Sequence, residues 1–322
     1  MNKIVKPVNA NAQQEVCNVL TYFNEIAGKK VILGQHTQTM EQEELAFIYN
    51  ATNELPALCG FELLAYSPNI NYRYCDRECL EEILSARGTL KKAWDWAEKH
   101  GLVTFTWHWF SPLYGKDKSF YTKNTTFNVE MAVQDGTDEN RAILADLDYM
   151  AGLLKPFCDA HIPVLWRPLH ECDGDWFWWG SKGAEVVKKL YRIMYGRFTN
   201  RYHLDNLIWV FNAAESSFYP GDDVVDIISI DMYPPPHCHT ACKEDLQKIS
   251  NFTTKEKIYA IGETGTVPDV HKIVEQGVPW TYYMTWSNDF GKTEKFSSKE
   301  TLRKNYKGSD AVTLSKLPKL YG

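Results

Sequence analysis

Eight short hydrophobic runs recur along the chain, and most are followed by a longer segment with the spacing of an amphipathic helix. Within each run the apolar residues are nearly continuous, which is typical of strands that helices cover on both faces. The runs occupy residues 31–36, 56–63, 102–109, 163–171, 207–213, 227–233, 258–265 and 280–288. The pattern therefore predicts eight strands that alternate with helices.

This order of elements favours an α/β fold, a single-domain (β/α)8 TIM barrel. The alternative is an open doubly wound sheet, in which the first strand leads into a glycine-rich phosphate loop. Here the first run continues as TQTMEQEE and has no GxGxxG motif. No repeat or linker divides the sequence, so we expect one catalytic domain over residues 1–322, with a lead-in to about 28 and a C-terminal helix and tail from about 300.

The charge balance narrows the range of partners. The chain has 35 Lys and Arg against 41 Asp and Glu, a net charge of −6, so we expect no nucleic-acid partner. No apolar run approaches the roughly 18 residues of a membrane span, so we expect no membrane partner. The N-terminus shows no signal peptide, which predicts a cytoplasmic protein, or a secreted one if the signal has been removed. We expect a monomer.

Eight cysteines are present, and a chain of this length does not need a disulfide framework. We therefore predict mostly free thiols. Cys75 with Cys79 and Cys238 with Cys242 have CxxxC spacing. Structural zinc usually takes two ligand pairs at matched spacing, so this pattern predicts no metal site.

Polar and aromatic residues gather at the ends of the hydrophobic runs. In a (β/α)8 barrel the chemistry lies at the carboxyl ends of the strands, and burying such groups unpaired would cost several kcal/mol. This arrangement predicts a functional site at the barrel mouth. The residues are Gln35, His36, Trp107, His108, Trp109, Arg167, His170, Glu171, Asn212, Asp231, Tyr233, Glu263, Trp286 and Asn288.

Glu171 and Glu263 end two runs that are well separated in the sequence. Retaining glycosidases need two carboxyl groups about 5–5.5 Å apart, one as nucleophile and one as acid. The alternative is that each glutamate forms a structural salt bridge, for example with Arg167. The presence of two such residues on one barrel favours catalysis.

Aromatic residues are abundant, with 11 Trp, 18 Tyr and 15 Phe. Trp176, Trp178 and Trp179 follow Glu171 closely and would be hard to bury together, so they predict a platform for the apolar faces of sugar rings. His36, His108 and His170 raise the alternative of a metal-dependent hydrolase. No HxH or HExxH motif accompanies them, so we expect no metal or other cofactor, and we expect at least two of these histidines to bind sugar hydroxyls.

The segment WRPLHECDGDWFWWG resembles glycoside hydrolase family 26, which is best known for β-mannanases. The resemblance runs from about residue 30 to 290 through GQH, TWHW, an SFY-containing insertion, DMY, IGETG and TWSND. It implies a retaining hydrolase that cuts β-1,4-mannosidic bonds in mannan, galactomannan or manno-oligosaccharides. A β-linked polysaccharide or oligosaccharide is then the expected partner.

The resemblance also assigns roles. Glu171 in RPLHE would be the acid/base and Glu263 in GETG the nucleophile, with Tyr233 holding the nucleophile and Arg167 bonded to the carboxylates. These donors would keep the pKa of Glu263 low, whereas aromatic surroundings and the charge of Glu263 would raise the pKa of Glu171. The full set of predicted substrate-binding residues is His170, Trp176, Tyr233, Trp286, Arg167, His108, Trp109, Phe211 and Asp231.

One departure from the family and two other functions stay open. Many family members read HEMNG where this chain has Cys172 and Asp173, which changes a loop or a contact beyond the cleaved bond. The barrel could instead hydrolyse mixed-linkage β-1,3-1,4-glucan or β-1,3-xylan. It could also bind carbohydrate without catalysis, although pure binding does not require paired carboxylates.

Overall fold

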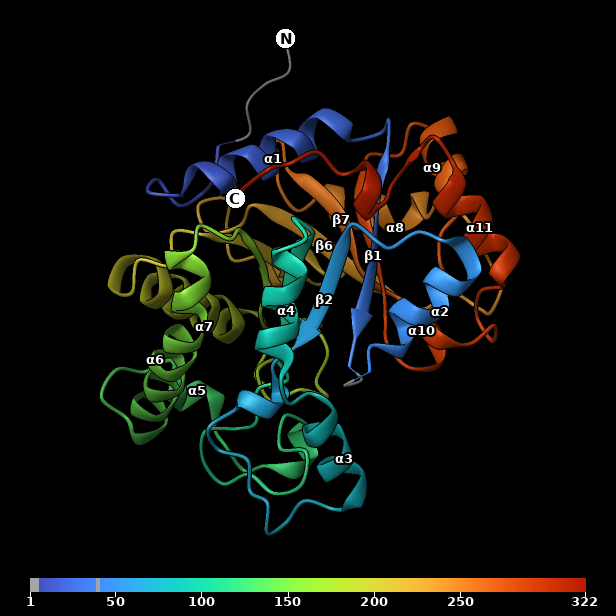
Figure 1. Cartoon of the computed structure of the whole chain (residues 1–322). Coiled ribbons are helices and arrows are strands. Elements are labelled where there is room, and N and C mark those ends of the chain that lie inside the picture. The colour runs from blue at the N-terminus through green and yellow to red at the C-terminus, as the bar shows by residue number, and fades with distance from the viewer. Residues whose placement is uncertain (1–5, 39–40) are drawn as a thin grey trace.

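The computed structural model describes residues 6–38 and 41–322, and its centre is a closed barrel of eight parallel strands (Figure 1). Each strand pairs with the next, and β1 pairs with both β2 and β8. The prediction of a (β/α)8 TIM barrel is therefore confirmed. The strands are β1 Val31–Thr37, β2 Leu58–Glu62, β3 Leu102–Thr106, β4 Val164–Arg167, β5 Leu207–Asn212, β6 Ile227–Met232, β7 Ile258–Thr264 and β8 Trp280–Thr285.

Helices surround the barrel because their apolar faces cover the outward side chains of the strands. The long helix α6 (Asp138–Asp159) begins at Thr137, whose side chain accepts the Asn140 N–H as an N-cap. The other helices are α1 Gln14–Ile26, α2 Glu43–Thr52, α3 Arg77–Ser85, α4 Thr89–Ala97, α5 Val129–Ala132, α7 Ala184–Gly196, α8 Lys243–Ser250, α9 Val270–Glu275, α10 Asp289–Lys292 and α11 Lys299–Lys307.

The amino-terminal end of the barrel is covered by α1 and by the C-terminal tail (Figure 1). Phe23 of α1 is fully buried, and its ring lies 6.0 Å from that of Tyr282 in β8. The short strand β9 (Ala311–Val312) pairs with the start of β1. Helix α1 and the C-terminal segment therefore close the side of the barrel opposite the mouth, which leaves the carboxyl ends of the strands free to carry the site.

Two long connections project beyond the carboxyl ends of the strands, at the bottom of Figure 1. One follows β2 and contains α3, and the other follows β3 and includes residues 107–128. Lys118 joins them, because its Nζ lies 2.9 Å from Glu78 Oε1 and 3.0 Å from Glu82 Oε1 of α3. Together they form a wall at one side of the barrel mouth.

All eight cysteines are free thiols, as the sequence predicted. Over residues 6–38 and 41–322, no helix combines the length and the apolar character that crossing a membrane requires.

Candidate active site

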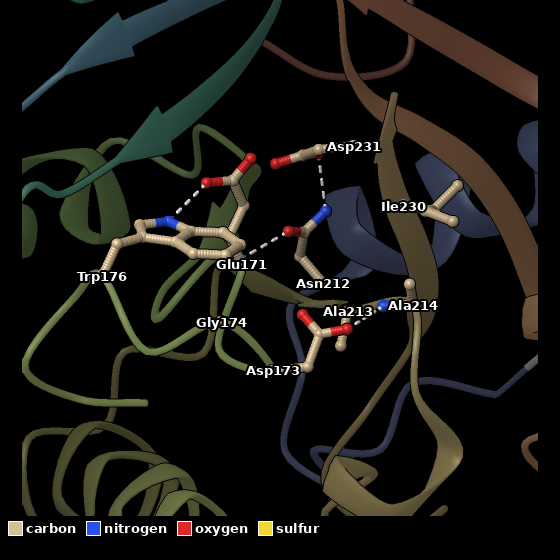
Figure 2. Close-up of a pocket in the computed structure, with 9 residues that line it drawn as sticks. All are labelled: Glu171, Asp173, Gly174, Trp176, Asn212, Ala213, Ala214, Ile230 and Asp231. Atoms are coloured by element: carbon tan, nitrogen blue, oxygen red, sulfur yellow. Dashed lines mark hydrogen bonds between the residues drawn. The ribbon is translucent and has the colours of Figure 1, made fainter. Parts of the chain in front are cut away.

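Three carboxylates converge at the barrel mouth, from Glu171, Asp231 and Glu263. One oxygen from each lies within 4.8 Å of one from each of the others. In Figure 2 the carboxylate of Glu171 points toward that of Asp231. A short separation between Glu171 and Glu263 leaves no room for a water molecule beneath a sugar, so it has the geometry of a retaining pair.

Glu171 is presented by a tight turn just after β4. Leu169 and Glu171 both have a φ of 51°, a left-handed conformation that costs about 1–3 kcal/mol at each non-glycine residue. The backbone N–H of Glu171 donates to Asn212 Oδ1 at 2.8 Å, and Trp176 Nε1 donates to Glu171 Oε2 at 2.9 Å (Figure 2). These contacts hold the turn and direct the carboxyl group into the mouth.

Glu263 lies on β7, is 4% exposed, and accepts a hydrogen bond at each carboxylate oxygen. Arg167 donates to Oε1, and the Tyr233 hydroxyl donates to Oε2 at 2.6 Å. Burial and the charge of Glu263 raise the pKa of Tyr233, so this hydroxyl keeps its proton and remains a donor. The carboxylate is thereby fixed in one orientation.

Arg167, the last residue of β4, links Glu263 to a second acidic group. Its Nη1 lies 2.8 Å from Asp231 Oδ2, and Asn212 Nδ2 donates to Asp231 Oδ1 at 2.7 Å. A Cβ at Gly262 would lie 2.6 Å from Asp231 Oδ1 and 2.8 Å from Asn212 Nδ2. The glycine before Glu263 in the GETG motif is therefore required for this network.

Burial and mutual repulsion perturb the pKa values of the carboxyl groups at the mouth. Burial and the negative charge of Asp231 raise the pKa of Glu171. The same causes raise the pKa of Glu263 although Arg167 opposes them, so the expectation of a low value from the neighbouring donors is wrong. Both oxygens of Glu263 already accept hydrogen bonds, whereas the one side-chain donor that contacts Glu171 in the described part of the chain is Trp176. The pKa of Glu263 is raised to about 8 and that of Glu171 to about 7, but the two donors favour the charged form of Glu263, so we expect Glu171 to carry the proton.

The pH dependence of kcat/KM should show whether Glu171 is protonated in the active protein. A raised pKa keeps Glu171 in its acid form to a higher pH than an ordinary glutamate, so the alkaline limb of kcat/KM should lie above the usual glutamate range. Asp231→Asn removes a negative charge and should move that limb toward lower pH. Initial rates across a pH series would check both expectations, and a limb that stays in place or moves upward in Asp231→Asn would contradict the assignment.

The variant Tyr233→Phe tests whether the hydrogen bond from Tyr233 to Glu263 supports catalysis. Tyr233→Phe removes the hydroxyl that donates to Glu263, and a hydrogen bond to a charged group contributes enough to change kcat by about 10–100-fold. We expect a lower kcat with a much smaller change in KM, measured on a manno-oligosaccharide. Tyr149→Phe, on the exposed face of α6, is the matched control. A kcat within twofold of the parent would show that this bond does not support catalysis.

His108 and His170 form a polar corner beside the carboxylates. His108 Nδ1 lies 2.8 Å from Glu62 Oε2, and the ring centroids of His108 and His170 are 4.6 Å apart. Burial lowers the pKa of His108, but the charge and hydrogen bond of Glu62, together with the charges of Glu263 and Glu171, outweigh burial and raise that pKa. Burial and the charge of His108 lower the pKa of His170, whose buried Nδ1 has no hydrogen-bond partner among the described residues. The pKa values of the two neighbouring histidines are therefore shifted in opposite directions.

Glu62 is a functional residue that the sequence reasoning missed. It is fully buried at the end of β2, and its Oε1 accepts the backbone N–H of His108 at 2.8 Å. Its position as an acidic residue at a strand end was the available signal. Its partner is 46 residues away, so the pairing could not be read from local sequence.

Two hollows lie on opposite sides of the mouth. The first, of about 180 Å³, is lined from the β4, β5 and β6 ends by Glu171, Asp173, Gly174, Trp176, Asn212, Ala213, Ala214, Ile230 and Asp231 (Figure 2). The second, of about 200 Å³, is lined from β1, β2, β3 and β8 by Gln38, Leu64, Glu82, Ser85, His108, Phe120, Tyr121, Trp286 and Asn288. A linear ligand that occupied both would pass over the carboxylates.

Some of the aromatic residues near the mouth line the two hollows, whereas others are buried in the core. Trp176 is 47% exposed and lines the first hollow, and Trp286 lines the second, where its ring lies 4.3 Å from that of His36. Trp178 and Trp179 are buried, so the prediction that all three neighbouring tryptophans form a sugar platform is wrong for these two. Their indole N–H groups donate to backbone carbonyls, which satisfies their polar atoms inside the core.

Two predicted substrate-binding residues do not reach the mouth. Phe211 is next to Asn212 on β5, and alternate side chains on a strand point to opposite faces, so Phe211 packs outward against Tyr191 of α7. Trp109 is buried with its Nε1 2.7 Å from Asp146 Oδ2. Both predictions are corrected: these residues support the site without lining it. The other predicted residues contribute to the network or to the hollows.

The three histidines at strand ends do not assemble a metal site. Over residues 6–38 and 41–322 the potential ligand atoms converge in two groups, and neither contains a histidine. One group is the carboxylate trio, in which Arg167 already provides a positive charge. The other, Cys75 with Cys79 and Asp117, lies away from the barrel mouth on α3 and the 107–128 connection.

Comparison with known proteins gives a consistent result. The model of glycosyl hydrolase family 26 matches residues 8–316. A mannan endo-1,4-beta-mannosidase of Thermothelomyces thermophilus is 32% identical over 317 residues, which cover 96% of this chain and 62% of that protein. The chain therefore spans less than two thirds of the length of this relative.

Solved structures extend the similarity to the whole barrel. A GH26-CBM35 β-(1,4)-mannanase of Podospora anserina has a TM-score of 0.87 at 30% identity and covers 98% of this chain and 69% of its own. A β-mannanase from a symbiotic protist of the termite Reticulitermes speratus, complexed with gluco-manno-oligosaccharide, has the same TM-score and identity and covers 98% of both chains.

Proposed function

Because the chain belongs to glycosyl hydrolase family 26, we propose that it is a retaining β-mannanase that hydrolyses β-1,4-mannosidic bonds. The observation that carries this proposal is the close approach of the Glu171 and Glu263 carboxyl groups, with two hydrogen-bond donors on Glu263. Similarity to mannan endo-1,4-beta-mannosidases supports mannan, galactomannan or manno-oligosaccharides as the substrate class.

The first step breaks the glycosidic bond. Glu263 attacks the anomeric carbon while Glu171 transfers its proton to the leaving oxygen, so an ester bond forms as the C–O bond to the leaving sugar breaks. Arg167 and Tyr233 orient the attacking carboxylate. Trp176 Nε1, bonded to Glu171 Oε2, leaves the other oxygen of the acid to face the leaving group.

The second step releases the sugar. Esterification removes the negative charge of Glu263, which lowers the pKa of Glu171, now a carboxylate. Glu171 takes a proton from a water molecule, and that water attacks the anomeric carbon from the face that the leaving sugar occupied. The ester bond breaks, Glu263 is again a carboxylate, and Glu171 is again an acid. Two inversions give net retention.

The shape of the mouth supports cleavage within a chain. One hollow holds Trp176 and Asp173, and the other holds Trp286, Tyr121 and His108, so aromatic walls flank the carboxylates on both sides. A sugar in the first hollow would meet Asp173, whose Oδ2 accepts the Ala214 and Glu215 N–H groups. This carboxylate is the place where the chain departs from HEMNG.

Product analysis tests the substrate. The protein would be incubated with linear mannan, galactomannan, mixed-linkage β-1,3-1,4-glucan and β-1,3-xylan, and the oligosaccharides released would be separated. We expect a ladder of manno-oligosaccharides from linear mannan and far slower release from the glucan and the xylan. If the glucan or the xylan were hydrolysed faster than mannan, that glycan would be the substrate instead. Binding to mannan without release of oligosaccharides would identify a non-catalytic carbohydrate-binding barrel.

A further inference from the structure

A second cluster of reactive side chains lies on the wall beyond the barrel mouth. Cys75 precedes α3 and is partly exposed, whereas Cys79 lies in the first turn of α3 and is fully buried. Asp117 belongs to the 107–128 connection. The two sulfur atoms and one oxygen of Asp117 lie within 4.8 Å of one another. Two separate segments therefore supply three potential ligand atoms to one point.

The three groups are held in place by backbone contacts. The side chain of Asp76 caps α3 by accepting the Cys79 N–H at 2.8 Å, and the N–H of Asp76 donates to Asp117 Oδ1 at 3.0 Å. The backbone N–H of Lys118 is directed to the Cys79 sulfur. These contacts fix the two sulfur atoms and the Asp117 carboxylate relative to one another.

The chemistry of this set favours a cation over a disulfide. A carboxylate adds nothing to an S–S bond, whereas two sulfur atoms and one carboxylate oxygen are ligand types that zinc accepts together. Zn–S bonds of about 2.3 Å and Zn–O bonds of about 2.0–2.2 Å place tetrahedral ligand atoms about 3.3–3.8 Å apart, within the separation found here. The exposed side of Cys75 would admit water as a fourth ligand.

We propose that Cys75, Cys79 and Asp117 form a binding site for a thiophilic divalent cation of the zinc class. The ion fastens α3 to the 107–128 connection, beside the Lys118 ion pairs with Glu78 and Glu82. Glu82 and Ser85 of α3 and Tyr121 of the connection line the second hollow. The ion thus stabilises one wall of the mouth without entering the chemistry.

Metal titration tests the proposal. The reduced, metal-free full chain would be titrated with Zn²⁺ by calorimetry and, in parallel, with Co²⁺, whose charge-transfer absorption reports thiolate ligands. We expect one bound ion and a thiolate–cobalt band. A hundredfold excess of free Zn²⁺ over Kd should raise the unfolding midpoint by about 5 °C.

Variants locate the site. Cys75→Ser and Cys79→Ser should each weaken binding at least tenfold and abolish the cobalt band, and Asp117→Asn should weaken binding while keeping the band. Cys238→Ser, at an exposed thiol that belongs to neither group of converging ligand atoms among the described residues, is the matched control. Cys75 is partly exposed, so its variant remains informative if Cys79→Ser fails to fold.

Three results would overturn the proposal: no Zn²⁺ binding by the reduced chain, binding that is unchanged in Cys75→Ser, or a cobalt complex without a thiolate band. The last would place the ion on the carboxylates of the mouth. Because none of these readouts depends on hydrolysis, failure here would leave the proposed mannanase activity untouched.

Discussion

Glu263→Gln is expected to lower kcat on linear mannan by about 10⁴-fold or more. An amide of the same size keeps the packing around residue 263, but it cannot form the ester intermediate. The neighbouring carboxylate of Asp231 cannot replace it, because Asp231 is bonded to both Arg167 and Asn212. The measurement is the initial rate of reducing-sugar release at saturating substrate.

Two controls separate loss of the nucleophile from loss of folding. Glu244→Gln changes an exposed glutamate of α8 and should keep the rate of the parent protein. The unfolding midpoint of Glu263→Gln should stay close to that of the parent or rise, since the variant removes a buried charge. A rate within tenfold of the parent would exclude Glu263 as the nucleophile.

Glu171→Ala should separate the two catalytic steps. The leaving oxygen of a mannan chain needs a proton, so hydrolysis of linear mannan should fall by about 10²–10⁴-fold. An aryl β-mannoside with a good leaving group needs no acid, and its first step should proceed. The second step lacks a base, so the glycosyl-enzyme should accumulate, and a burst of released phenol would measure it.

A small anion provides the decisive comparison for this variant. Azide can enter the space left by the carboxyl group and attack the intermediate without a base, so it should accelerate turnover of the aryl substrate and give a β-mannosyl azide. The same addition to the parent protein should change little. Normal hydrolysis of mannan by Glu171→Ala would refute its role as the acid, and turnover that azide does not change would refute its role as the base.

The fold and the convergence of Glu171 and Glu263 could be predicted from the sequence for a physical reason. Strands buried on both faces have to be continuously apolar, so a polar residue is tolerated only where such a run reaches the barrel mouth. Glu171 and Glu263 stand at such points, and the structure brings their oxygens within 4.8 Å. Arg167, Tyr233 and Asp231 follow from the same rule, and all three join the network.

The wrong predictions for the aromatic residues have one cause: the sequence does not show in which direction each side chain points. Phe211 and Asn212 are neighbours at one strand end, but the two-residue period sends only Asn212 to the mouth. The turn after Glu171 directs Trp176 outward and Trp178 and Trp179 into the core. Composition gives the number of aromatic residues, whereas the path of the loop decides which of them face a ligand.

Contacts between residues that are far apart in the sequence could not be predicted from local motifs either. Glu62 contacts His108 across 46 residues, and Asp117 lies beside two cysteines that its own segment does not contain. The balance of charge on Glu263 depends on burial and on Asp231 as much as on the donors that the motifs suggest. Such distances and burial are properties of the folded chain.

The stereochemistry of the first product distinguishes a double displacement from a single one. A retaining mechanism requires the carboxyl groups of Glu171 and Glu263 to face each other across a gap of one sugar. Proton NMR of the anomeric region, recorded during early hydrolysis of a manno-oligosaccharide, distinguishes the two anomers before they equilibrate. We expect the β-anomer as the first product, because two inversions at the anomeric carbon retain its configuration. Initial formation of the α-anomer would mean a single displacement by water and would contradict the retaining mechanism.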